Sequence, residues 1–202
     1  MSSRETRGPR TGFVTRRTAE TDIELRLVLD GAGEADVQTG IGFFDHMLTA
    51  FARHGLFDLT VRVDGDLHVD GHHTVEDTGL CLGQALHAAL GDKAGIQRFG
   101  SAHVPMDDAL VLAALDLSGR PYLAYDLTPA GRIGQFDAVL AEEFFRAFAT
   151  TGGVTLHVRQ LAGKNEHHII EAAFKAVARA LKDAAAFDPR VKGVPSTKGM
   201  LA

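Results

Sequence analysis

The sequence predicts an α+β protein built from two similar halves. Strand-like and helix-like segments follow one another in the same order twice along the 202 residues. The six residues HHTVED, 72–77, have a counterpart in HHIIEA, 167–172, and each stands at the head of the second helical segment of its half. Two units are too few for a solenoid, so we expect the halves to face each other around a pseudo-two-fold axis.

In the first half, residues 23–33, IELRLVLDGAG, alternate and then turn, which predicts a strand with one buried face. Residues 43–54 place apolar side chains at helical spacing, and Gly55 stands where a left-handed cap is favoured. Residues 56–65 predict a second strand. Residues 72–93 predict a long helix that Gly91 ends.

The second half repeats this order. Residues 109–119 match the first strand and turn, and 141–152 match the first helix, AFATTG corresponding to AFARHG. Residues 154–163 match the second strand, and 167–186 match the long helix. The alignment of the halves brings Glu143 opposite His46.

These patterns divide the chain into four parts. Residues 1–12 are polar with Gly and Pro, and we expect a disordered tail. Residues 13–98 form the first α+β half and 99–190 the second. Residues 191–202 are a C-terminal segment that, by itself, is typical of a loose tail.

Composition narrows the class of protein. The net charge of −5 argues against a broad nucleic-acid surface while leaving room for a small basic pocket. No apolar run of about 18 residues predicts a membrane span, and the polar N-terminus lacks the apolar stretch of a signal peptide. The single cysteine, Cys81, fits a reducing cytoplasm and a packed, inert thiol.

The repeated HHxxE motif predicts a metal centre. Neighbouring residues on a helix point about 100° apart, so adjacent histidines do not easily share one ion, and each doublet naturally serves two. The glutamate lies one turn beyond the histidines and can join either of them. A single motif of this kind is more often a helix start that is capped and solvated. A pair of helix caps, however, would not require both histidines and the glutamate to recur together. Eight donors follow, about four for each of two ions: His46, His72, His73, Glu76, Glu143, His167, His168 and Glu171.

Five segments, in order, resemble the imidazoleglycerol-phosphate dehydratase family of histidine biosynthesis: FFDHML, DGHHTVEDTGLCLGQAL, LDLSGRPYL, LAGKNEHHIIEAAFKAVARAL and PSTKG. The resemblance covers roughly residues 14–202. It implies that each half has the fold of the second domain of ribosomal protein S5, giving two sheets with helices packed between them. It also implies a 24-subunit shell built from trimers, with two Mn²⁺ ions per site and sites between subunits.

The resemblance carries over seven of the metal ligands: His46, His72, His73, Glu76, His167, His168 and Glu171. Glu143 stands where many members have a histidine, so its role as eighth ligand is the open point. The implied reaction is the dehydration of D-erythro-imidazoleglycerol phosphate to imidazole acetol phosphate by a hydro-lyase. A carboxylate must take a proton from carbon, and Glu20, Glu76 and Glu171 are the candidates, between which the sequence does not choose.

Further residues are implied as contacts of the substrate. The phosphate needs cations and hydrogen-bond donors. The resemblance assigns contacts to Arg98, Arg120, Lys175, Ser196, Thr197 and Lys198, although a lone arginine is more often a surface residue. His54, beside a helix-ending glycine, is expected to line the pocket. Glu20, His46, His72, Glu76 and His167 are expected to contact the substrate as well.

Two other functions are compatible with the metal motif. A dinuclear hydrolase would use a metal-bound hydroxide and would release inorganic phosphate from the same substrate. A metal-storage or metal-dependent assembly protein would need no phosphate pocket, so the SGRP and STK segments, 118–121 and 196–198, argue against it.

Overall fold

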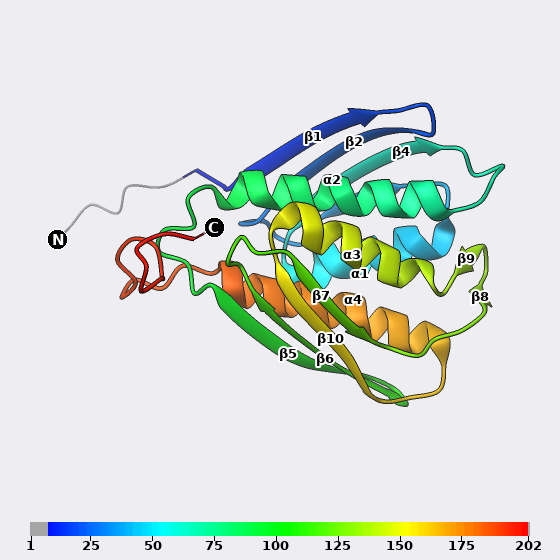
Figure 1. Ribbon diagram of the computed structural model, residues 1–202. Helices are drawn as coiled ribbons and strands as arrows, with labels where there is room; N and C mark the ends of the chain where they lie inside the picture. Colours follow the sequence, from blue (N-terminus) through cyan, green and yellow to red (C-terminus); the bar gives the residue numbers. More distant parts are fainter. Residues whose placement is uncertain (1–7, 202) are drawn as a thin grey trace.

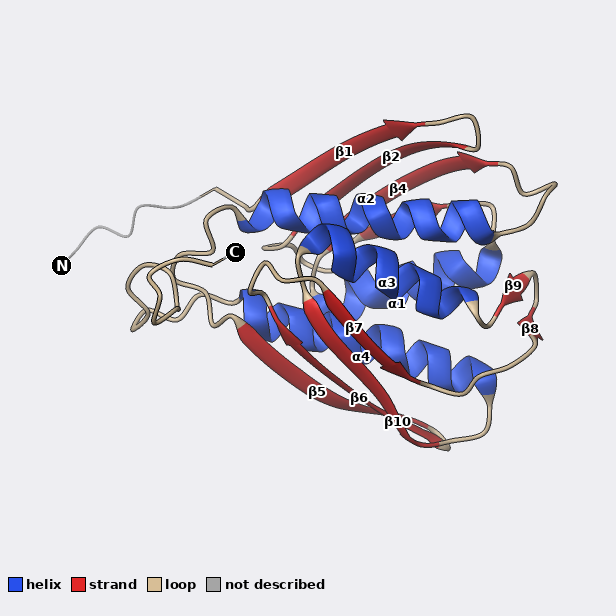
Figure 2. Cartoon of the chain, in the orientation of Figure 1, coloured by secondary structure: helices blue, strands red, loops and turns tan. Residues whose placement is uncertain are grey.

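The computed structural model describes residues 8–201 and contains two four-stranded sheets with four helices between them (Figure 2). The first half comprises β1 (Thr11–Arg17), β2 (Thr21–Val28), β3 (Ala35–Gln38), α1 (Gly42–Gly55), β4 (Asp58–Gly65) and α2 (His72–Leu90). The second comprises β5 (Phe99–Met106), β6 (Ala109–Asp116), β7 (Tyr122–Asp126), α3 (Leu140–Gly152), β10 (Thr155–Ala162) and α4 (Glu166–Ala185). The short strands β8 (Arg132–Ile133) and β9 (Phe136–Asp137) form a hairpin between β7 and α3.

The two sheets have the same topology. Their strand orders are β1-β2-β4-β3 and β5-β6-β10-β7, and in each sheet the last pair is parallel while the others are antiparallel. The predicted α+β duplication with helices between two sheets is therefore confirmed.

The inner faces of the sheets carry the core. In β2, Ile23, Leu25 and Leu27 are buried while the residues between them are exposed, as the alternation predicts. The long helix of each half packs against the short helix of the other, α2 on α3 and α1 on α4. Gly79 permits the first of these contacts, because a Cβ there would lie 2.6 Å from the carbonyl oxygen of Phe144.

Two local predictions need correction. The expected tail of residues 1–12 is too long, because β1 begins at Thr11 and Gly12 pairs with Leu27; residues 1–7 lie outside the described part. The end of α1 also differs, since Leu56 and not Gly55 adopts the left-handed conformation, with φ of 56°. Gly55 is needed for space instead, because a Cβ would lie 2.2 Å from the ring of Phe57.

All four helices begin at the same end of the molecule, beside the β8–β9 hairpin, and the described C-terminal segment lies at the opposite end (Figure 1). The histidine doublets open α2 and α4, so both lie at the first end. Among residues 8–201, no helix is long and apolar enough to cross a membrane.

Candidate metal centre and phosphate pocket

Three of the predicted ligands meet at the junction of α1 and α4. The Nε2 atoms of His46 and His167 lie 3.3 Å and 3.1 Å from the same oxygen, Oε2 of Glu171. One donor atom from each of the three residues lies within 4.8 Å of the others. The His46 and His167 rings have centroids 6.0 Å apart. Nitrogen and carboxylate oxygen donors at this spacing fit a divalent transition-metal ion.

Glu171 is held as a carboxylate although its side chain is only 7% exposed. Burial opposes its ionisation, but a hydrogen bond from Lys175 at 2.6 Å and the nearby charges of Lys175 and His46 outweigh that effect and lower its pKa. The predicted substrate contact Lys175 therefore lies against a predicted metal ligand, one turn along α4. Its Nζ also lies 3.5 Å from Sδ of Met106.

The first doublet forms a second group at the start of α2. Nε2 of His72 lies 3.7 Å from Oε2 of Glu76 on the same helix. His73 turns its ring away from His72, with the two planes at 90°. Its Nε2 lies 3.7 Å from Oε1 of Glu20, the acid of the β1–β2 turn. The candidate base thus lies beside a predicted ligand of its own chain.

The second doublet has the same divergence. The ring planes of His167 and His168 make an angle of 77°. His167 faces Glu171, whereas His168 faces the β5–β6 turn, where its Nδ1 lies 2.7 Å from Asp108 and its Nε2 3.6 Å from Asp107. Asn165 caps α4 by accepting hydrogen bonds from the backbone N–H groups of both histidines.

Glu143 and His54 lie apart from these pairs. Glu143 is in the first turn of α3, and its nearest cation is Arg146 on the same helix, at 4.0 Å. His54 is in the last turn of α1; burial, together with the charges of Lys175 and Arg179, lowers its pKa. The structure brings neither side chain into the His46, His167 and Glu171 group.

Five of the six predicted phosphate contacts line one cavity at the opposite end of the molecule. Arg98, Arg120, Ser196, Thr197 and Lys198 surround a volume of about 330 Å³ with Met200 and Leu201. Lys175, the sixth, lies on α4 next to Glu171.

The C-terminal segment is tied to this cavity by Arg98. Its guanidinium donates to both carboxylate oxygens of Asp116, at 2.7 and 2.9 Å, and to the carbonyl oxygen of Pro195, at 2.9 Å. The bond with Asp116 raises the pKa of Arg98. Ser196, Thr197 and Lys198 follow Pro195 directly, so this hydrogen bond anchors the chain immediately before them.

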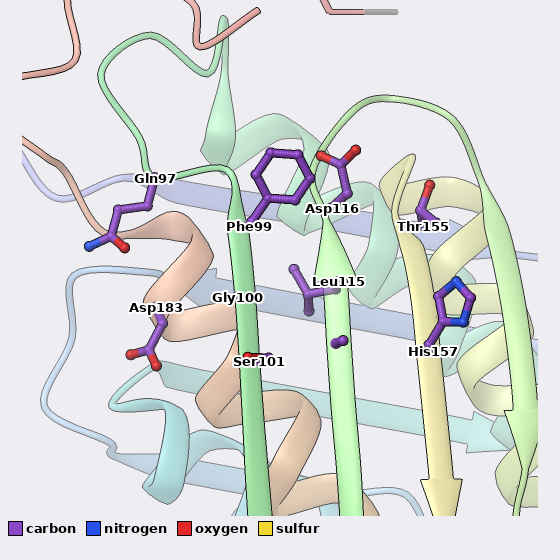
Figure 3. Close-up of a pocket in the computed structure, with 10 residues that line it drawn as sticks. Gln97, Phe99, Gly100, Ser101, Leu115, Asp116, Thr155, His157 and Asp183 are labelled. Atoms are coloured by element: carbon purple, nitrogen blue, oxygen red, sulfur yellow. The ribbon is translucent and has the colours of Figure 1, made fainter.

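A larger cavity lies on the outer face of the second sheet, but it contains none of the predicted site residues. Its volume is about 570 Å³, and Phe99, Asp116, His157 and Asp183 are among its lining residues (Figure 3). It opens widely to solvent. The predicted donor groups lie at the helix ends and in the C-terminal cavity, so these two places form the candidate functional site.

Sequence reasoning missed four polar residues of these sites: Asp66, Asp108, Asp116 and Asn165. Asn165, immediately before a helix, has the signal of an N-cap. The three aspartates lie at strand ends or turns, where such residues are common, and nothing in the pattern distinguishes them.

Comparison with known proteins finds related chains. A family model described as imidazoleglycerol-phosphate dehydratase matches residues 39–181. The imidazoleglycerol-phosphate dehydratase of Paracoccus denitrificans is 63% identical over 194 residues, covering 95% of this chain and all of the relative. That of Symbiobacterium thermophilum is 62% identical over 193 residues, covering 95% and 93%.

Solved structures with a similar fold are known as well. The crystal structure of imidazoleglycerol-phosphate dehydratase from Staphylococcus aureus has a TM-score of 0.80 at 36% identity, covering 88% of this chain and 99% of that one. The enzyme from Pyrococcus furiosus has a TM-score of 0.81 at 40% identity, covering 93% and 100%.

Proposed function

Because the chain belongs to the imidazoleglycerol-phosphate dehydratase family and dehydrates imidazoleglycerol phosphate in histidine biosynthesis, we propose that it does so at a metal-dependent site shared between chains. The reaction is that of a hydro-lyase: a C–H proton and a hydroxide leave, and the product is imidazole acetol phosphate. The observation that carries the metal proposal is the meeting of His46, His167 and Glu171 around one point.

We propose two Mn²⁺ ions per site, held by the eight predicted ligands His46, His72, His73, Glu76, Glu143, His167, His168 and Glu171. Imidazole nitrogen and carboxylate oxygen suit Mn²⁺, and also Fe, Co or Zn. Bound ions would supply Lewis-acid catalysis and a template for the imidazole ring. The divergent rings within each doublet support ligation of different ions by neighbouring histidines.

The separation of the two sites within one chain supports a shared active site. Arg98 of the phosphate cavity donates its backbone N–H to the carbonyl of Ala184, at the C-terminal end of α4. Glu171 lies 13 positions earlier on that helix, which a rise of 1.5 Å per residue converts to about 20 Å. A three-carbon chain between ring and phosphate cannot span this distance. The metal end of one chain must therefore meet the C-terminal cavity of another.

A homo-oligomer follows from this requirement, and we propose the 24-subunit assembly that the family resemblance implies. Closed symmetry lets every metal end meet a C-terminal cavity with no site left incomplete. Light scattering on the purified protein tests this, because 24 chains of 21.6 kDa have a mass of about 520 kDa. A monomer with full turnover would contradict the shared site.

Among the three candidate bases, we propose Glu20 as the proton acceptor. Its side chain is 52% exposed beside His73, where a substrate can reach it. Glu171 is buried, paired with Lys175 and held ionised, so it is better suited to ligation. Glu76 faces His72 on its own helix. A Glu20→Gln variant that keeps its metal and its turnover would exclude Glu20.

We also propose a cytoplasmic location. Cys81 is a free thiol buried in the core, and burial raises its pKa to about 11, so the chain has no need of an oxidising compartment. Fractionation of cells with an antibody against the chain tests this.

The experiment that tests the function is turnover of imidazoleglycerol phosphate after EDTA treatment and after addition of Mn²⁺. We expect imidazole acetol phosphate to form only in the metal-loaded protein, without release of inorganic phosphate. Phosphate release would indicate the hydrolase instead. Tight Mn²⁺ binding without either product would indicate storage or metal-dependent assembly.

A further inference from the structure

The second histidine of each doublet faces a carboxylate from outside its own helix. Nδ1 of His73 lies 3.0 and 3.2 Å from the two carboxylate oxygens of Asp66. Nδ1 of His168 lies 2.7 Å from Oδ1 of Asp108. The first histidine of each doublet behaves differently, since Nε2 of His72 and of His167 faces the glutamate one turn along its own helix.

The two aspartates are not equivalent positions of the duplication. Asp66 follows the end of β4, whose counterpart is β10, whereas Asp108 lies in the turn between β5 and β6, whose counterpart is the β1–β2 turn. Inheritance from one ancestral half therefore does not explain both contacts. Two different loops bring a carboxylate to the same atom of equivalent histidines, which indicates a shared requirement at that atom.

The hydrogen bond selects one tautomer of each neutral ring. An ionised carboxylate only accepts hydrogen bonds, so Nδ1 must carry the proton and donate it. Nε2 is then the unprotonated nitrogen of the neutral ring, and its lone pair is free for a metal ion. In both histidines Nε2 points to the opposite side, toward Glu20 at 3.7 Å and Asp107 at 3.6 Å.

Each aspartate is itself held in place by the backbone. The other oxygen of Asp108 accepts the N–H groups of Lys164 and Asn165, at 2.7 and 3.1 Å, which ties the β5–β6 turn to the start of α4. The N–H of Asp66 donates to the carbonyl of Glu20, at 3.0 Å. Asp66 therefore contacts both the ring of His73 and the β1–β2 turn, in which the proposed base Glu20 lies.

Building on the proposed metal function, we propose that Asp66 and Asp108 are positioning residues that orient His73 and His168 and direct their Nε2 atoms to the metal ions. Carboxylates behind ligating histidines fix ring orientation and increase ligand basicity, and their loss weakens metal affinity by about 10–100-fold. The side chain of Asp66 contacts only the His73 ring among the hydrogen bonds of the described residues, so its removal leaves the backbone bonds intact.

The test is the Mn²⁺ dissociation constant of the full-length assembly, followed by the electron paramagnetic resonance of free Mn²⁺. We expect Asp66→Ala and Asp108→Ala to weaken binding at one of the two sites by about 10–100-fold. Asp66→Asn, which keeps an acceptor but loses the charge, should have a smaller effect. Asp64→Asn removes the same charge from an exposed position on β4 and should bind as the wild type does.

A coupling measurement separates positioning from a structural role. If Asp66 acts through His73, Asp66→Ala in a His73→Gln background should weaken Mn²⁺ binding no further. Full additivity of the two substitutions would overturn the proposal, as would wild-type affinity in both Asp66→Ala and Asp108→Ala. Failure of the wild-type protein to bind Mn²⁺ would instead overturn the metal-dependent function on which the proposal rests.

Discussion

Glu171 on α4 and His46 on α1 are 125 positions apart in the sequence, yet Oε2 of the first lies 3.3 Å from Nε2 of the second. The contact crosses from one half of the duplication to the other. The packing of α1 against α4 therefore builds the candidate metal centre, and neither half has the three donors by itself.

Replacement of Glu171 tests this centre first. We expect Glu171→Gln to weaken Mn²⁺ binding at one site by at least about 100-fold, because a neutral amide replaces a charged ligand. This is more than we expect from the loss of Asp66 or Asp108, which would only orient a ligand. Metal analysis after gel filtration should then find one ion per chain in place of two. Glu166→Gln, five positions earlier on α4, is the matched control and should retain both ions. Two ions retained in Glu171→Gln would exclude it as a ligand.

Adjacent glutamates on α3 test the proposed eighth ligand. Glu142 and Glu143 both lie in the first turn and near Arg146, so the two glutamine variants remove the same charge from almost the same place. We expect Glu143→Gln to lower Mn²⁺ affinity by about 10-fold or more and Glu142→Gln to have little effect. Equal Mn²⁺ affinities of the two variants in a titration would exclude Glu143 and leave seven protein ligands in the proposed metal site.

Lys198 tests the phosphate cavity. We expect Lys198→Ala to raise KM by about 10-fold or more, since a charge-assisted hydrogen bond contributes about 1.5–3 kcal/mol. Metal content should not change, because none of the residues that line the cavity is a predicted metal ligand. Lys192→Ala removes a lysine of the same segment outside the cavity and serves as control. An unchanged KM for Lys198→Ala in steady-state assays would remove this lysine from the phosphate site.

Asp58 gives a pH-dependent prediction. Its Oδ1 accepts the N–H groups of Glu34, Ala32 and Gly33, and these bonds lower its pKa. The unfolded state binds the proton more readily, so the stabilisation is fully present above the unfolded pKa of about 3.9 and is lost as the pH falls through the lower folded value.

Urea unfolding at fixed protein concentration measures that contribution. We expect Asp58→Asn to be less stable than the wild type by about 1–2 kcal/mol at pH 7, with the difference shrinking below about pH 4. Asp64→Asn, exposed on the same strand, should show no such difference. A deficit of Asp58→Asn that stayed constant down to pH 2 would rule out the charge as its source.

Much of the fold was predictable because the duplication repeats strong signals. Alternating apolar residues identify β2, and helical spacing identifies α1 and α4. The strands β1 and β3 carry weaker signals. In β1 only Gly12 is buried, and none of the four residues of β3 is fully buried. Such strands are defined by pairing with a neighbour, which local sequence does not encode.

The candidate site was predictable where the chemistry repeats. The HHxxE motif appears twice, so its residues were identified together. Asp66 and Asp108 were not, because a lone aspartate at a strand end or in a turn has an ordinary structural reason to be there. Their contact with a histidine ring depends on how loops meet helices in three dimensions. The same holds for the ion pair of Asp116 with Arg98.

In the proposed active site, one chain supplies the metal end and another chain supplies the phosphate cavity. The most direct measurement is complementation between Glu171→Gln and a chain ending at residue 195, co-expressed with different tags and purified as mixed assemblies. We predict that each variant alone is almost inactive and that mixed assemblies regain turnover, because some sites combine an intact metal end with an intact C-terminal segment. Mixed assemblies no more active than the two variants assayed separately would contradict a site shared between chains.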